Sequence, residues 1–174
     1  MADQKVTELT ADTSPTSDDL VVTVNDPSGT PGNKKVTLAT LGLAGAWTPW
    51  TPTLSGGWNA TGNATFDCKY IQLGKTVIAR VSITNGTTTT YQSGNMTFTL
   101  PVNTTTFGSI GSSYCEHSGT GYLGTFMPTS GSTVFLVVGG SGGSFVTSNV
   151  ANNTTPFTWT TGDFIQGIMV YEAA

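Results

Sequence analysis

The sequence predicts an all-β fold, with an extended N-terminal arm that carries short strands (residues 1–46) and a β-sandwich or jelly-roll-like module (residues 47–174). The first observation is the alternation of apolar residues with other residues, which in TVIARVSIT places Val77, Ala79 and Val81 on one face of an extended chain. The second is abundant Thr, whose branched side chain suits a pleated surface. The third is that no useful length of the chain has helical periodicity. These features favour a sandwich or jelly roll of many short strands.

The predicted elements follow in order along the chain. The arm holds two apolar runs, DDLVVTVND (18–26) and KKVTLATLGLAG (34–45), separated by the turn residues PSGTPGN. A Trp-Pro stretch, AWTPWTPTLSGGW, opens the module. Clusters of Gly, Asn, Ser and Thr then separate the strands that we expect at 64–73, 76–84, 95–100, 107–117, 120–127, 132–138, 144–148, 157–160 and 163–171.

The last of these strands is apolar on both faces. In DFIQGIMVYEA one face holds Phe164, Ile168 and Val170, and the other holds Ile165, Met169 and Tyr171. A one-sided strand over a core should have a polar outer face, so we infer that this strand also meets another subunit. We predict that Ile165, Met169 and Tyr171 form the subunit interface.

Charge is scarce and unevenly placed. Charged residues make up 9% of the chain, against about 25% in an average soluble domain. The arm carries six acids and three bases, and the module four acids and three bases. Nucleic acid is therefore not an expected partner, because phosphate binding needs clustered Lys and Arg.

No apolar run has the length of a signal peptide or a membrane span, so we expect no membrane role and synthesis in a cytosol. In that compartment Cys68 and Cys115 are expected to be reduced thiols packed in strands, although one disulfide between them is the alternative.

The N-terminal segment resembles the leading segment of many tailed-bacteriophage virion proteins. The resemblance rests on K-x-T-E-L at Lys5 to Leu9, on SPTSDDLVV at Ser14 to Val22, and on KKVTLA-x-L at Lys34 to Leu41. The module is similar in style to the small β-modules that follow this segment, through W-T-P-x-L at Trp50 to Leu54 and YIQLGKTV at Tyr70 to Val77.

This resemblance implies a structural virion protein, assembled in the host cytoplasm and attached by its arm to the major capsid protein or another virion protein. It also implies a homotrimer. We expect a capsid decoration or head-fibre protein, with a tail-fibre or receptor-binding protein as the alternative. The arm would add strands to its partner, or else fold back on its own module. The predicted anchoring residues are Leu9, Leu20, Val22, Val24, Val36, Leu38 and Leu41.

Other functions receive less support from the sequence. His117 is the only histidine, and zinc needs three or four ligands, so no metal or other cofactor is expected. The module's acids, Asp67, Glu116, Asp163 and Glu172, show no spacing that marks a hydrolase pair, so we expect no enzyme activity. Trp47, Trp50 and Trp58 could stack on a host surface glycan or, alternatively, plug the base of the module.

Overall fold

The structure is a computed structural model and describes residues 19–25, 32–37, 47–105, 108–142 and 145–174. The chain divides into two compact units, residues 1–45 and 46–174. Every strand pair in the described ranges is antiparallel, and these ranges contain no helix. The predicted all-β, sandwich-like fold is confirmed. The jelly-roll arrangement remains a prediction.

The first unit contains a two-stranded hairpin, β1 (Leu20–Asn25) and β2 (Gly32–Thr37). Its register pairs Leu20 with Thr37 and Val22 with Lys35. Because neighbouring residues of a strand point to opposite faces, the pair Val21–Val36 lies on the other face of the hairpin.

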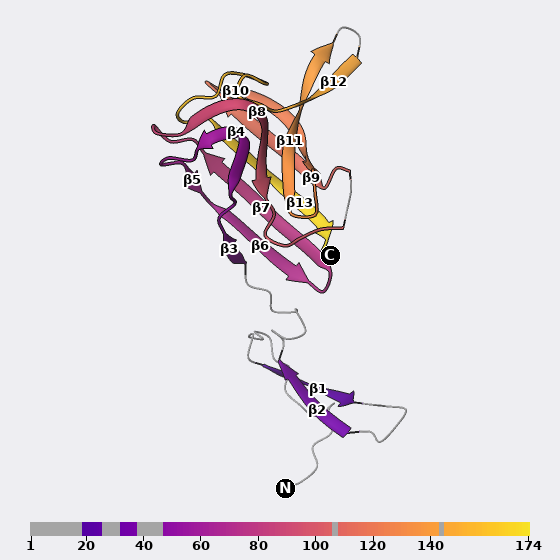
Figure 1. Ribbon diagram of the computed structural model, residues 1–174. Helices are drawn as coiled ribbons and strands as arrows, with labels where there is room; N and C mark the ends of the chain where they lie inside the picture. The colour runs from indigo at the N-terminus through magenta and orange to yellow at the C-terminus, as the bar shows by residue number, and fades with distance from the viewer. Residues whose placement is uncertain (1–18, 26–31, 38–46, 106–107, 143–144) are drawn as a thin grey trace. The chain divides into compact units, whose positions relative to one another are not determined.

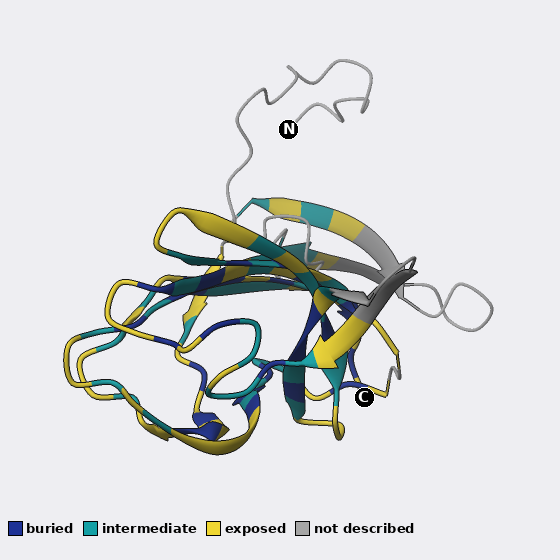
Figure 2. Cartoon of the chain, turned by 90° about the horizontal axis from the view of Figure 1, so that it is seen from above, coloured by how far each residue is buried: buried dark blue, intermediate teal, exposed yellow. Residues whose placement is uncertain are grey.

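The second unit is one large curled sheet. Its strands follow the order β3-β6-β7-β13-β9-β10-β11-β8-β4, with β12 paired to β11 and β5 to β7. Figure 1 labels them, and Figure 2 shows the curl from above with the buried residues in dark blue. Their bounds are β3 Thr48–Trp50, β4 Leu54–Ala60, β5 Thr65–Phe66, β6 Cys68–Leu73, β7 Thr76–Thr84, β8 Thr90–Thr99, β9 Gly111–His117, β10 Thr120–Pro128, β11 Thr133–Gly142, β12 Phe145–Val150 and β13 Phe164–Glu172.

The core lies inside the curl and comes from alternate residues of the strands. β7 contributes Val77, Ala79, Val81 and Ile83, all at most 1% exposed. The ring of Phe98 on β8 meets that of Phe126 on β10 edge to face, with centroids 5.5 Å apart. Such a pair adds about 0.5–1.5 kcal/mol beyond its buried area. The second unit therefore has a hydrophobic core of its own.

Several strand predictions differ from the structure, and β8 begins at Thr90 rather than at residue 95. Residues 157–160 are irregular, because Phe157 and Trp159 pack on each other with centroids 4.4 Å apart and the Trp159 indole N–H donates to the carbonyl of Asn152 at 2.9 Å. The expected strand 64–73 is divided at Asp67, between β5 and β6. The Trp-Pro stretch, for which no strand was predicted, supplies β3 and most of β4.

Candidate functional site: the outer face of β6, β7 and β13

Three adjacent strands, β6, β7 and β13, form a regular lattice of side chains on the side away from the core. Ile71, Ile78 and Val170 are cross-strand partners and make one aliphatic row. On one side of it lie Lys69, Arg80 and Ile168, and on the other Leu73, Thr76 and Glu172. We call these nine residues, with Ser82 and Gln166 of the next row, the outer face.

The outer face exposes large apolar side chains. Leu73 is 43% exposed, Ile168 46% and Val170 51%. Leu123 on the nearby strand β10 is 75% exposed. Single exposed apolar residues are ordinary, whereas several on adjoining strands make an apolar patch on this side of the sheet.

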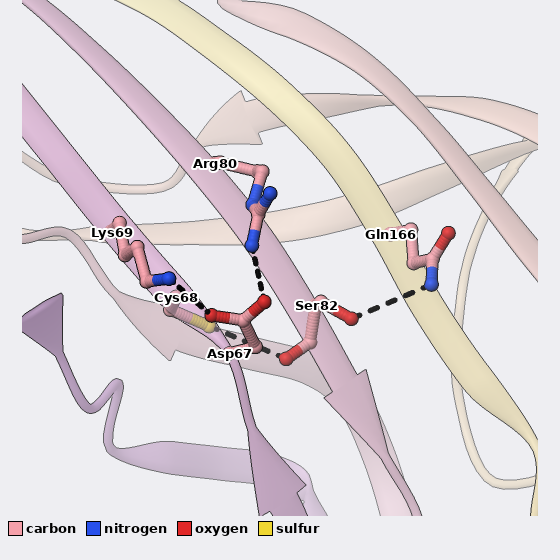
Figure 3. A network of polar contacts seen from close by, with 6 residues as sticks. All are labelled: Asp67, Cys68, Lys69, Arg80, Ser82 and Gln166. Carbon is pink, nitrogen blue, oxygen red and sulfur yellow. Dashed lines mark hydrogen bonds and ion pairs between the residues drawn. The ribbon is translucent and has the colours of Figure 1, made fainter. Parts of the chain in front are cut away.

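An ion-pair network lies beside the aliphatic row. Asp67 accepts a bond from Arg80, and its Oδ1 lies 3.2 Å from the Lys69 ammonium (Figure 3). The hydrogen bond from Lys69, followed by the positive charges of both neighbours, holds the pKa of the Asp67 carboxyl below its usual value. These side chains are about half exposed, so solvent weakens the pairs and their contribution to folding is small.

A groove of about 590 Å³ crosses β7, β13 and β9 next to this network. The short side chains Ser82 and Ser112 leave space between the longer Arg80, Tyr114 and Ile168. In Figure 3 the Gln166 amide points from β13 toward Ser82, and the two side chains are 3.5 Å apart at the limit of a hydrogen bond. The amide therefore keeps most of its hydrogen-bonding capacity.

Tyr114 forms one wall of the groove and is held in place. A Cβ on Gly121 would lie 2.4 Å from the Tyr114 ring, so the ring lies across β10 directly over this glycine. The phenol hydroxyl donates to Glu116 at 3.0 Å, and this bond raises the pKa of the Tyr114 hydroxyl. A fixed ring next to an amide and hydroxyls could contact an amphipathic ligand such as a sugar.

The two cysteines are buried free thiols. Burial raises the pKa of the Cys68 thiol, and it raises that of Cys115 to about 12. Thiols of this kind are poor nucleophiles at neutral pH, because the reactive form is the thiolate.

His117 and Asp163 form the other notable polar pair. The imidazole Nδ1 lies 3.0 Å from a carboxylate oxygen of Asp163, and its ring stacks on Phe157 at 4.9 Å. Asp163 also accepts from the backbone N–H of Thr160 at 2.6 Å. These contacts join the ends of β9 and β13, which is a structural role, and the described residues contain no cluster suited to a metal ion.

The predicted subunit-interface residues lie in the core of their own chain. Ile165 is 1% exposed, Met169 0% and Tyr171 4%. The prediction that these three meet another subunit is wrong, because each is buried in the hydrophobic core of its own chain. The opposite face of β13, with Ile168 and Val170, is the one that remains available.

The three predicted glycan-binding tryptophans are not one exposed cluster. Trp58 is 3% exposed and packs against Tyr91 and Trp159, so the glycan role is wrong for this residue. Trp50 is partly buried against the core, and Trp47 is 47% exposed.

The predicted anchoring residues fall partly on the hairpin. Leu20 is 55% exposed and Val22 71%, whereas Val36 is partly buried on the other face. Val24 belongs to β1, and its side chain lies outside the description. Leu9, Leu38 and Leu41 lie outside the described residues.

The sequence prediction missed the aliphatic row on the outer face. The two-residue turn Gly74-Lys75 fixes the register of β6 and β7, and this register places Ile71 opposite Ile78. That turn was the signal in the sequence that could have revealed the row.

Comparison with known proteins finds no matching family model, no matching curated protein and no matching solved structure. Within the described part of the chain, no helix has the length and apolar character needed to cross a membrane.

Proposed function

We propose that the chain is a structural component of a tailed-bacteriophage virion, a trimeric capsid decoration or head-fibre protein attached by its N-terminal arm. The observation that carries the proposal is the separate hairpin of β1 and β2, which exposes Leu20 and Val22. The sequence around the hairpin resembles the leading segments of virion proteins, which supports another virion protein as the partner of the arm.

The physical reason for a partner is the poor stability of a hairpin alone. Two strands in water are marginal, because they bury too little apolar surface to offset the entropy of ordering. A virion protein that pairs with an edge of β1 or β2, or covers Leu20 and Val22, supplies that surface. Each of these side chains contributes roughly 1.5–3 kcal/mol when fully buried.

The second unit is the part that such an arm would display. Its hydrophobic core is built from residues of 46–174, so we expect this unit to fold without the arm. This separation of an anchor from a self-contained β-module suits a protein that decorates a surface.

A second candidate function is binding of a host surface glycan, as in a tail-fibre or receptor-binding protein. The groove beside Tyr114 and Gln166 favours it, since it combines an aromatic ring with hydrogen-bonding groups. Glycan-array binding that is lost in Tyr114→Ala, and is kept in Trp58→Phe, would support this function.

The attachment proposal is tested by co-sedimentation with particles of the phage that encodes the chain. The intact chain should bind, and residues 47–174 alone should not. Val22→Ala should reduce occupancy well below that of Lys35→Ala, its exposed cross-strand partner. High salt should remove little protein, because apolar burial outweighs exposed ion pairs. Equal binding by the truncated chain would refute the proposal.

A further inference from the structure

Asn85 and Gly86 follow directly after β7 and are the only Asn-Gly pair in the sequence. In such a pair the glycine nitrogen can attack the side-chain carbonyl carbon of the asparagine. Glycine favours this attack because it has no Cβ to hinder the ring that forms and because its backbone reaches many conformations. An unfolded chain is free to react in this way, so the way in which the fold holds the two residues determines whether the native chain reacts as well.

The backbone of Asn85 is fixed on both sides. Its N–H donates to the Asp163 carbonyl at 2.9 Å, and its carbonyl accepts from the Gly162 N–H at 2.9 Å. The side chain is 3% exposed, and its amide atoms have no hydrogen-bond partner among the described residues. A close-packed amide on a fixed backbone has little freedom to turn toward the next nitrogen in the chain, and little contact with the water that completes the reaction.

The nitrogen of Gly86 is held as well. Its N–H donates to the Thr89 hydroxyl at 3.0 Å, and this bond must break before the nitrogen can lose its proton. A Cβ on Gly86 would lie 2.2 Å from Oδ1 of Asn63 and 2.4 Å from the backbone oxygen of the same residue. The Asn63 Oδ1 also accepts from the Thr88 N–H at 2.8 Å, so a side chain at position 86 would disturb a contact that orders the loop. The packing of this loop therefore favours the glycine that makes the pair reactive.

We infer that Asn85 is a self-modification site that folding keeps closed and unfolding opens. In the reaction the Gly86 backbone nitrogen gives its proton to solvent base and forms a bond to Cγ of Asn85. The bond from Cγ to the side-chain nitrogen breaks, and this nitrogen takes up a proton and leaves as ammonia. Water then opens the five-membered imide at either of its carbonyls, which leaves aspartate or isoaspartate at position 85.

Both products conflict with the native site. Aspartate places a carboxylate without a partner where the side chain is 3% exposed, next to Asp163, which is 4% exposed. A buried and unpaired charge strongly disfavours the folded state. Isoaspartate adds a carbon to the main chain between the N–H and the carbonyl of Asn85, so the two backbone bonds to residues 162 and 163 no longer fit together. A modified chain should not refold, and time spent unfolded becomes an irreversible loss.

Peptide mapping by mass spectrometry measures the reaction in the full chain at mildly alkaline pH, with and without guanidinium chloride. In the denaturant Asn85 should be converted faster than Asn59, because the latter is followed by Ala60, whose Cβ hinders the ring. In the folded chain the conversion of Asn85 should be at least about tenfold slower than in the denaturant, since only the opened fraction reacts. Equal rates for Asn85 in the two conditions, or no faster reaction at Asn85 than at Asn59 in the denaturant, would overturn the inference.

Two threonine variants test the local bond. Thr89→Val removes the acceptor of the Gly86 N–H, and Thr99→Val removes an acceptor of the same kind, which the Thr53 N–H meets at 2.9 Å. In the folded chain, Thr89→Val should accelerate the conversion of Asn85 clearly more than Thr99→Val does. Equal rates in the two variants would show that the contacts of the loop do not close the site.

Refolding of two variants at position 85 tests the consequence. Asn85→Leu should regain the native tryptophan fluorescence after removal of the denaturant, because the amide has no hydrogen bond to lose. Asn85→Asp carries the charge of one product and should not regain it. The wild-type fraction that refolds should also fall in step with the fraction converted at Asn85. Full refolding of Asn85→Asp, or of converted wild-type chains, would refute the claim that the modification prevents a return to the fold.

Discussion

Met169 and Val170 are adjacent on β13, and substitutions at the two positions should differ greatly in their cost to the free energy of unfolding. Met169 is 0% exposed, and its cross-strand partners are Ala79 and Gly111, which are too small to move into vacated space. Met169→Ala should therefore leave a cavity and cost about 4 kcal/mol, near the upper part of the usual 2–5 kcal/mol range. Val170 is 51% exposed, so the nearly isosteric Val170→Thr should cost no more than about 0.5 kcal/mol in the isolated chain.

Urea unfolding followed by fluorescence of the buried tryptophans measures both effects. Dilute protein should be used, so that association does not contribute to the free energy of unfolding. In thermal unfolding, 4 kcal/mol corresponds to a fall of about 8–16 °C in Tm for a chain of this length. A Val170→Thr variant as unstable as Met169→Ala would mean that β13 is shifted by one residue, because such a shift exchanges the two faces.

Two further predictions concern the interior. Burial raises the pKa of Cys115 to about 12, against 9.0 for an ordinary thiol. The unfolded chain loses this proton first, so the contribution of this thiol to stability should be constant below about pH 9 and fall from there to pH 12. Cys115→Ala should reduce that fall, measured as the urea midpoint against pH, and an unchanged slope would contradict it. Trp159→Phe should cost about 1 kcal/mol more than Trp58→Phe, because it removes the bond to Asn152, whereas the Trp58 N–H has no partner among the described residues. Equal costs in urea unfolding would show that this bond contributes nothing.

Strands with strong alternation could be predicted from the sequence. β7 spans Thr76–Thr84 as expected, because its apolar residues occupy every second position and a short turn precedes it. β4 could not be predicted in the same way. Gly56 has a φ of 69°, and a Cβ there would lie 1.9 Å from the backbone oxygen of Asn95, so the strand is irregular and has little alternation.

The face of β13 that meets the core could not be read from that strand alone. Both faces are apolar, and a period of two residues does not say which one is buried. The pairing with β7 determines which face of β13 is buried, because it places Tyr171 beside the buried Val77 and Ile168 beside Arg80. The sequence therefore indicated that β13 has two apolar faces, but only the register assigned them.

The ion-pair network was also beyond sequence reasoning. Asp67 and Arg80 are thirteen residues apart, and they meet because the β6–β7 hairpin folds one strand back on the other. Groups of this kind depend on the pairing register between strands, which the alternation within a single strand does not specify. Tyr114 is similar, since its position depends on a glycine in the neighbouring strand.

Imaging of the intact particle by electron cryo-microscopy tests the central claim most directly. The map should contain three copies of the β-module projecting from the capsid, and the β1–β2 hairpin of each copy should pack against another virion protein and cover Leu20 and Val22. Particles that lack the chain, or a bound chain whose hairpin contacts only solvent while the β-module makes the attachment, would contradict the account.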